Sequence, residues 1–210
     1  FMGWKCSDGR TYQANETVTV EKDMTFTAVW SALPDIEPGE PDEPDVPDFP
    51  FTDVSVNAWY YEAVKYVYEN GIMNGMDRYS FQPNGTLTRA MVWTIIARAE
   101  GVDTDAGALW YSCAQEWAAD CGISDCTEPE ASITREQLVT MLYRLCGEPG
   151  DSDALDAAPD SGAVSSWARE AMAWALELGL IEGDETGAIR PADTATRAEA
   201  AAILMRLAQN

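Results

Sequence analysis

Apolar residues recur at helical spacing along the chain after residue 50. One apolar face is formed by Trp59, Ala63, Tyr66 and Val67. It predicts a helix that Asn57 caps, that runs through Glu69 and that ends at Gly71, where glycine can adopt the left-handed conformation. A second helix is expected after each Thr-Arg pair, at about 89–99, 135–146 and 197–208. The pattern predicts three helix–loop–helix units, which must pack on one another because none can bury its apolar face alone.

The chain repeats itself at a spacing of 108 residues. Five features recur at this offset without a gap: Trp59 as Trp167, Gly71 as Gly179, Gly75 as Gly183, Pro83 as Pro191, and Thr88-Arg89 as Thr196-Arg197. A diverged unit between them keeps Trp110, Gly122 and Thr134-Arg135, is five residues shorter between glycine and arginine, and is expected to lack the proline turn. We therefore divide this part of the chain into copy 1 (51–102), copy 2 (103–150) and copy 3 (151–210).

The first 50 residues follow a different pattern. Residues 17–20 and 25–30 are rich in β-branched and aromatic side chains, which predicts two strands of a small β unit over residues 1–32. Residues 33–50 carry six prolines and seven acids, a composition typical of a semi-rigid polyproline II spacer; a ligand for a proline-binding domain is the alternative. Because the chain enters the β pattern at Phe1, we expect a longer parent protein with any signal peptide upstream. The expected fold class is mainly α, with a short N-terminal β fragment.

The charge of the chain excludes several functions. It carries 36 acidic and 13 basic residues and no histidine, for a net charge of −23. Such a field repels nucleic acid, and without histidine neither Ser-His nor Cys-His catalysis is available. The sequence contains no nucleophile elbow, phosphate loop or metal-ligand spacing, so we expect no catalysis, no cofactor and no metal. No apolar run approaches the roughly 18 residues of a membrane span, so we expect no membrane insertion.

The Thr-Arg pairs are candidate binding sites as well as helix starts. Thr196 with Glu199, and Thr134 with Gln137, form capping boxes, whereas Thr88 keeps only the cap. Capping does not explain Arg89, Arg135 and Arg197, because a cation at the first helical position opposes the helix dipole. Each arginine beside unpaired backbone N–H groups predicts an anion site; alternatively, a carboxylate holds it.

Tryptophans and aspartates stand at equivalent places in the copies. Trp59, Trp110 and Trp167 begin the first helix of each copy, where they either pack in the core or stack on a sugar ring at a groove edge. Asp53 and Asp160 precede two of them and either accept hydrogen bonds from a ligand or stabilise a loop turn.

Four of the five cysteines lie in copy 2. Cys113 and Cys121 are eight residues apart on one expected helix and cannot bond to each other. If the two helices of copy 2 run antiparallel, Cys146 returns near Cys113, and Cys126 lies near Cys121. This predicts two disulfides, Cys113–Cys146 and Cys121–Cys126, with buried free thiols as the alternative and a thiolate metal site as a weaker one.

The motifs of copies 1 and 3 resemble S-layer homology repeats. In copy 1 they are Phe51-Thr52-Asp53, Trp59, Gly71-Ile72-Met73-Asn74-Gly75, Phe81-Gln82-Pro83 and Thr88-Arg89-Ala90. In copy 3 they are Trp167, Gly179-Leu180-Ile181-Glu182-Gly183, Arg190-Pro191 and Thr196-Arg197-Ala198-Glu199. Copy 2 is similar in its tryptophan, glycine and Thr-Arg pair, although Gln137, like Met91 of copy 1, replaces the family's glutamate. Residues 1–32 look like the tail of a Listeria–Bacteroides type extracellular repeat.

This resemblance implies a pseudo-threefold helical bundle that anchors a Gram-positive surface or S-layer protein, without a covalent bond, in the cell wall. In such proteins the grooves between repeats bind an anionic secondary cell-wall polymer, often one bearing pyruvylated amino sugars. By the resemblance, the ligand-binding residues are Arg89, Arg135, Arg197, Asp53, Asp160, Trp59, Trp110 and Trp167. The alternative is a structural or protein-interaction module whose grooves no longer bind carbohydrate.

The net charge limits how an anionic polymer can bind. Wall polymers of this kind are acidic, so the protein as a whole repels them. Binding must therefore come from a few arginine pockets, and we expect affinity to rise with moderate salt as the repulsion is screened.

Overall fold

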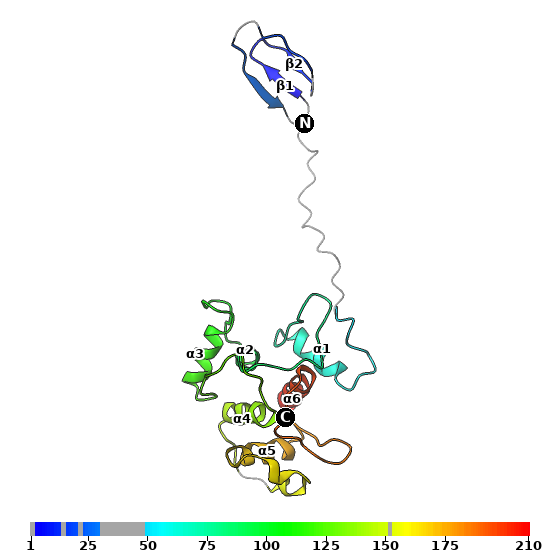
Figure 1. The fold of residues 1–210 in the computed structure, drawn as a ribbon, viewed down its shortest axis with the longest axis vertical. Coiled ribbons are helices and arrows are strands. Elements are labelled where there is room, and N and C mark those ends of the chain that lie inside the picture. The colour runs from blue at the N-terminus through cyan, green and yellow to red at the C-terminus, as the bar shows by residue number, and fades with distance from the viewer. Residues whose placement is uncertain (1–2, 14–15, 21–22, 30–48, 151–152) are drawn as a thin grey trace. The chain divides into compact units, whose positions relative to one another are not determined.

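The computed structural model describes residues 3–13, 16–20, 23–29, 49–150 and 153–210 (Figure 1). They fall into two compact units, one within residues 1–46 and the other within residues 47–210. Almost all of the expected spacer at 33–50 lies outside the described residues.

The N-terminal unit holds a three-stranded antiparallel sheet. Its strands are β1 (Gly3–Cys6), β2 (Thr11–Tyr12) and β3 (Phe26–Val29), in the order β2-β1-β3. Trp4 of β1 lies opposite both Tyr12 and Ala28. The strand predicted at 25–30 is confirmed as β3, but the one at 17–20 is wrong: four exposed or half-buried residues there pair with no strand among the described residues. Their β-branched side chains have no neighbouring strand to pack against, so local propensity alone does not form a strand.

The second unit is helical: its described residues form six α-helices, two in each copy as the pattern predicts. The helices are α1 (Tyr61–Glu69), α2 (Arg89–Ala99), α3 (Ser112–Asp120), α4 (Arg135–Leu145), α5 (Arg169–Glu177) and α6 (Arg197–Gln209). Short 3₁₀ turns η1 (Ala154–Ala157), η2 (Ser161–Ala163) and η3 (Ser166–Ala168) precede α5. Within the described residues, no helix has both the length and the apolar character needed to cross a membrane.

The first helix of copy 1 starts later than predicted. Asn57 does not cap it; α1 begins at Tyr61, after Tyr60, which makes no side-chain cap bond. Gly71 has a φ of 67°, as the predicted helix stop requires. Helices α2, α4 and α6, by contrast, begin directly after their capping threonines. Thr88, Thr134 and Thr196 each accept the N–H three residues on, and the last two complete capping boxes.

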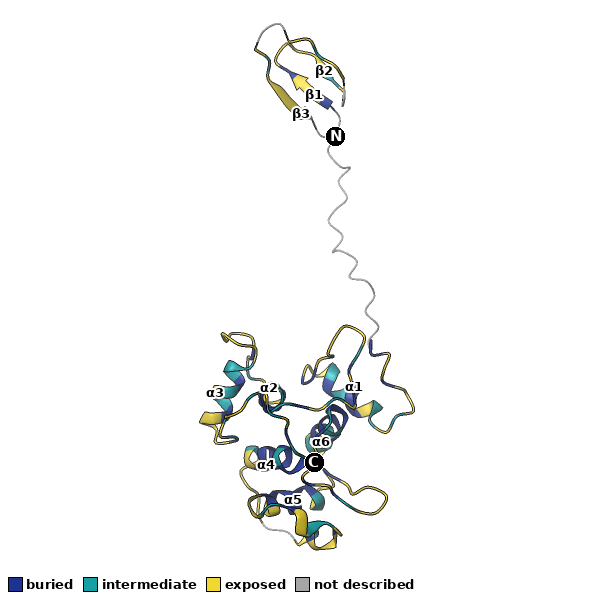
Figure 2. Cartoon of the chain, in the orientation of Figure 1, coloured by how far each residue is buried: buried dark blue, intermediate teal, exposed yellow. Residues whose placement is uncertain are grey.

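The helices pair between copies. Helix α2 packs against α3, α4 against α5, and α6 against α1, so the last copy closes on the first. In Figure 1, α2, α4 and α6 lie at the centre with α1, α3 and α5 around them, and Figure 2 shows buried residues gathered on the central helices. The predicted disulfides assumed that α3 and α4 of copy 2 form a hairpin. Because each of these helices packs against a neighbouring copy, that assumption is wrong.

The central helix starts are tied to the loops of the following copy. Isolated bridges join Thr86 to Thr196, Thr88 to Ser132 and Thr134 to Thr194. The first two N–H groups of each central helix donate to loop carbonyls: Arg89 and Ala90 to Ala131 and Pro129, Arg135 and Glu136 to Asp193 and Pro191, Arg197 and Ala198 to Gly85 and Pro83. The three copies therefore interlock through the same backbone pattern, used three times.

Copy 2 does contain the proline turn, contrary to the prediction. Glu128 has a φ of 51°, close to the 56° of Gln82 and the 49° of Arg190, and each of these residues precedes a proline. Pro129 stands six residues before Arg135, the same spacing as in the other copies. Copy 2 is five residues shorter upstream of the turn, between Gly122 and Thr127. An alignment that counts from Gly122 therefore fails to pair Pro129 with the prolines of the other copies.

Candidate functional site

Three grooves open between the copies, and each contains the same four parts. We call Arg89, Arg135 and Arg197 the first arginines, and Arg98, Arg144 and Arg206 the second arginines, of copies 1, 2 and 3. Because the copies form a closed ring, each groove takes a loop residue and the second arginine from one copy. The next copy supplies the exposed tryptophan, and the preceding copy supplies the first arginine. Groove A contains Asn74, Arg98, Trp110 and Arg197. Groove B contains Asp125, Arg144, Trp167 and Arg89. Groove C contains Glu182, Arg206, Trp59 and Arg135. Their volumes are about 300, 250 and 430 Å³ in that order, and every groove draws on all three copies.

The tryptophans lie at groove edges and not in the core. Trp59 is 67% exposed, Trp110 52% and Trp167 53%. Each stands just before its outer helix or in the short turn that leads into it. The core-packing alternative is therefore wrong for all three. An exposed indole ring is suited to stack on a flat ligand face.

The first arginines are buried, and their Nε atoms hold the copies together. Arg89, Arg135 and Arg197 are 9%, 5% and 5% exposed. Their Nε–H groups donate to the carbonyls of Thr127, Ile189 and Phe81, at 2.9, 2.9 and 2.7 Å. Each acceptor stands eight residues before the arginine of its own copy. Part of each arginine is thus structural, which leaves its outer nitrogens to face the groove.

The backbone at the helix starts cannot form the predicted anion site. That prediction required unpaired N–H groups beside each arginine. The first two N–H groups instead donate to loop carbonyls of the next copy, and the third donates to the capping threonine. Any anion in the grooves must therefore be bound by side chains.

The three first arginines differ in their remaining partners. The Arg89 guanidinium pairs with Asp125 and also donates to Ser124. Arg135 pairs with Glu199 at 2.7 Å. The carboxylate alternative therefore holds for these two arginines.

Arg197 is the exception. Its Nη2 donates to the Asn74 carbonyl at 2.6 Å, and its guanidinium lies 4.4 Å from the centre of the Phe81 ring. No carboxylate among the described residues pairs with it. Burial lowers the pKa of Arg197 to about 10, against the opposing effect of Asp53, so it stays charged at neutral pH.

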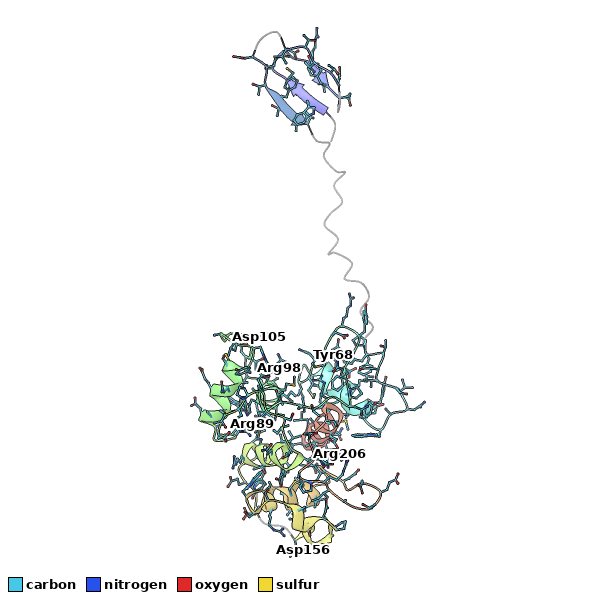
Figure 3. All side chains as sticks on the ribbon, in the orientation of Figure 1. Tyr68, Arg89, Arg98, Asp105, Asp156 and Arg206 are labelled. Carbon is cyan, nitrogen blue, oxygen red and sulfur yellow. The ribbon has the colours of Figure 1, made fainter. Side chains whose placement is uncertain are left out.

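A second arginine in each groove was missed by sequence reasoning. Arg98, Arg144 and Arg206 each stand nine residues after the first arginine, a spacing visible in the sequence (Figure 3 labels Arg98 and Arg206). Arg144 donates to the Ile123 carbonyl and Arg206 to that of Leu180, both just after the glycine that ends an outer helix. Arg98 instead donates to Thr104. Each groove therefore contains at least two guanidinium groups.

Asp53 and Asp160 line none of the three grooves. The Asp53 carboxylate accepts the N–H groups of Phe81 and Gln82 at 2.8 Å, and Asp160 accepts those of Ile189 and Arg190 at 2.9 and 2.8 Å. Burial raises the pKa of Asp53, but these amides and the Ser80 hydroxyl lower it further, to below its usual value. Both aspartates fix the loop whose carbonyl holds the first arginine.

All five cysteines are free thiols, and the structure joins neither predicted pair. Cys126 donates its S–H to the Gln115 carbonyl at 3.2 Å, and Cys121 and Cys146 are exposed at helix ends. Burial raises the pKa of Cys126 and of Cys146, which favours the protonated thiol. No cluster of three potential metal ligands occurs within the part of the chain that the structure describes.

Comparison with known proteins bears on the helical unit. A sequence model of the S-layer homology domain matches residues 50–90 and 159–201. The amylopullulanase of Thermoanaerobacterium thermosulfurigenes is 30% identical over an alignment of 174 residues that covers 75% of this chain. The endoglucanase of Bacillus sp. (strain KSM-635) is 26% identical over 75% of this chain, and the S-layer protein of Bacillus thuringiensis subsp. finitimus 25% over 74%. The chain spans only 9%, 18% and 21% of these relatives.

Proposed function

This chain carries S-layer homology domains, and on that premise we propose that it is a non-catalytic module that anchors a bacterial surface protein in the cell wall. The ligand we propose is an anionic secondary cell-wall polymer bearing pyruvylated amino sugars. It binds in the grooves between the copies, outside the cell.

The observation that carries this proposal is the threefold recurrence of one arrangement. Each groove combines an exposed indole with a first and a second arginine from different copies. A guanidinium fits a carboxylate with two parallel hydrogen bonds, and an indole face offers a sugar ring a flat apolar surface. A ketal carboxylate on a sugar presents both features to the groove at once.

The relatives support a role that does not depend on one chemistry. Three of them are named as an amylopullulanase, an exoglucanase and an endoglucanase, and three as S-layer or surface-layer proteins. Five of the six match over 172 to 174 residues, and the other over 112. A segment found both in enzymes and in surface-layer proteins fits a role in holding the parent protein at one location. Catalysis in the parent protein would reside in other domains.

We also propose that copy 2 is a third, divergent S-layer homology repeat in a pseudo-threefold bundle. It supplies a central helix, a tryptophan, two arginines and a proline turn at the positions used by the other copies. The N-terminal unit is proposed to be the tail of a Listeria–Bacteroides type extracellular repeat, joined by the acidic spacer.

Co-sedimentation tests the proposal. The full chain is mixed with Gram-positive cell-wall sacculi before and after chemical extraction of the secondary polymer. We expect it to pellet with intact sacculi and to stay in solution with extracted ones. Equal pelleting in both cases would overturn the proposal.

A triple variant connects pelleting to the grooves. Trp59→Ala/Trp110→Ala/Trp167→Ala removes three exposed rings and should leave the fold intact while abolishing pelleting. Tyr79→Ala, which removes an exposed aromatic ring outside the grooves, is the matched control. A triple variant that pelleted as well as the parent would favour the alternative, a structural or protein-interaction module.

A further inference from the structure

We propose that groove A is the carboxylate-binding groove of this chain, and that grooves B and C do not contribute a comparable anion site. The inference rests on the proposed wall-binding function and identifies which of the three similar grooves performs it. The ligand is the carboxylate-bearing sugar of the proposed function, and the new element is the groove that binds it.

The three grooves differ in the net charge that their lining residues present to a ligand. Groove C contains three arginines and four carboxylates: Arg135, Arg190 and Arg206 against Glu182, Asp184, Glu185 and Glu199. Groove B contains two arginines and one acid, which pairs with Arg89. Among the described residues that line groove A, two are cations and none is acidic. The lining charge is thus +2 in groove A, +1 in groove B and −1 in groove C, so a bound carboxylate meets the most positive charge in groove A.

The third residue of a central helix can neutralise the first arginine of the preceding copy. In copy 3 this residue is Glu199, which completes the capping box and also neutralises Arg135. In copy 1 it is Met91, which lines groove A and can do neither. The substitution that weakens the helix cap therefore leaves Arg197 without a carboxylate partner.

The loop between the two glycines of copy 1 (71–75) lacks the acid that the equivalent loop of copy 3 (179–183) carries. Glu182 of copy 3 forms an ion pair with Arg206 at 3.2 Å. The equivalent residue of copy 1 is Asn74, whose side chain is exposed and uncharged. Arg98, the counterpart of Arg206, lies 4.0 Å from the highly exposed carboxylate of Asp105, a contact that solvent screens strongly. Arg98 is therefore only weakly paired, and no carboxylate that lines groove A neutralises Arg197, so the groove keeps its positive charge.

The apolar lining of groove A determines what accompanies the carboxylate. Its thioether and aliphatic side chains are Met73, Met76, Met91 and Ile95. Methionine is flexible and polarisable and packs against small apolar groups of varied shape. Trp110 borders the same space, so a sugar ring can stack on the indole while a methyl or acetyl group packs against the methionines.

The experiment places an acid in groove A. Asn74→Glu copies the residue that copy 3 carries at the same place, and the Asn74 backbone carbonyl that holds Arg197 is unchanged. Asn57→Glu adds the same charge at an exposed position outside the grooves. We expect parent and Asn57→Glu to bind intact sacculi equally, and Asn74→Glu to bind at least about tenfold more weakly because like charges repel.

A second variant separates binding from folding. Met91→Glu should complete the capping box of α2 and raise the unfolding temperature, yet weaken binding to sacculi as Asn74→Glu does. Mild acid treatment of the sacculi, which hydrolyses pyruvate ketals, should lower parent binding to the level of these variants.

The outcomes of these experiments are distinguishable. A parent chain that fails to bind intact sacculi overturns the wall-binding function itself. A parent that binds, together with undiminished binding by Asn74→Glu and Met91→Glu, overturns the assignment to groove A alone. Parent binding that survives removal of the ketals overturns the carboxylate chemistry.

Discussion

Grooves A and C are built from equivalent parts of one fold, yet they present opposite charge to a ligand. Both contain a buried first arginine, a second arginine near the end of a central helix and an exposed tryptophan. Two of their differences place an acid beside an arginine in groove C and none in groove A: Met91 against Glu199 and Asn74 against Glu182. The comparison shows that the repeat determines where the cations stand, whereas a few side chains determine whether those cations are available.

The largest expected effect tests whether the arginine of groove C is structural. Arg135→Ala should lower the free energy of unfolding by about 3 kcal/mol, because it leaves the largely buried Glu199 carboxylate without its closest partner. Arg190→Ala, which removes a half-exposed partner of the same carboxylate, should cost less than about 1 kcal/mol. Urea denaturation measures both. Equal losses would mean that Arg135 is no more committed to the fold than a surface cation.

A smaller effect should convert groove C toward groove A. Glu182→Gln/Glu185→Gln removes two of the four acids and should add a second, weaker binding event, with an affinity gain of about tenfold in groove C. Isothermal calorimetry with polymer released from sacculi would detect it as a rise in stoichiometry. Glu62→Gln/Glu170→Gln makes the same change in net charge on the outer helices and should leave the stoichiometry at one. An unchanged stoichiometry in the groove variant would contradict the charge explanation.

The smallest effect concerns the loop that supports groove A. The pKa of Asp53 is lowered in the folded state, so its stabilisation is present above the unfolded value near 3.8 and is lost as pH falls through the lower folded value. Asp53→Asn should reduce stability at pH 7 by about 1 kcal/mol through weaker hydrogen bonds, and should lose less than the parent between pH 5 and pH 3.

Thermal unfolding across this pH range measures both differences for Asp53→Asn. Asp160→Asn in copy 3 is the matched loop variant and should show a similar loss at pH 7. A parent and an Asp53→Asn variant with parallel acid profiles would show that this carboxylate does not hold the loop.

The central helices could be predicted from sequence because their signals are local. A threonine cap and an apolar face act within a few turns of the chain, and α4 and α6 add a glutamine or glutamate three residues on. Helices α2, α4 and α6 begin where these signals place them. The first helix of copy 1 lacks such a cap, and its predicted start was three residues early.

The packing partners could not be predicted, because they depend on contacts far apart in the sequence. Each central helix packs against the outer helix of the next copy, so a hairpin within copy 2 was the wrong basis for pairing its cysteines. The N–H groups at the helix starts were expected to be free, but their acceptors lie in loops of other copies. The tryptophans and first arginines were found because they recur, and Arg98, Arg144 and Arg206 recur at a spacing that would have revealed them too.

The ring closure between α6 and α1 has a consequence for how such a chain can evolve. Copy 3 supplies Arg197 to groove A, Trp167 to groove B and α6 to groove C. Losing any one copy by recombination therefore damages all three grooves at once, and inserting one breaks the ring. The three copies must therefore be kept together, while single residues within them can differ, as Met91 and Glu199 do.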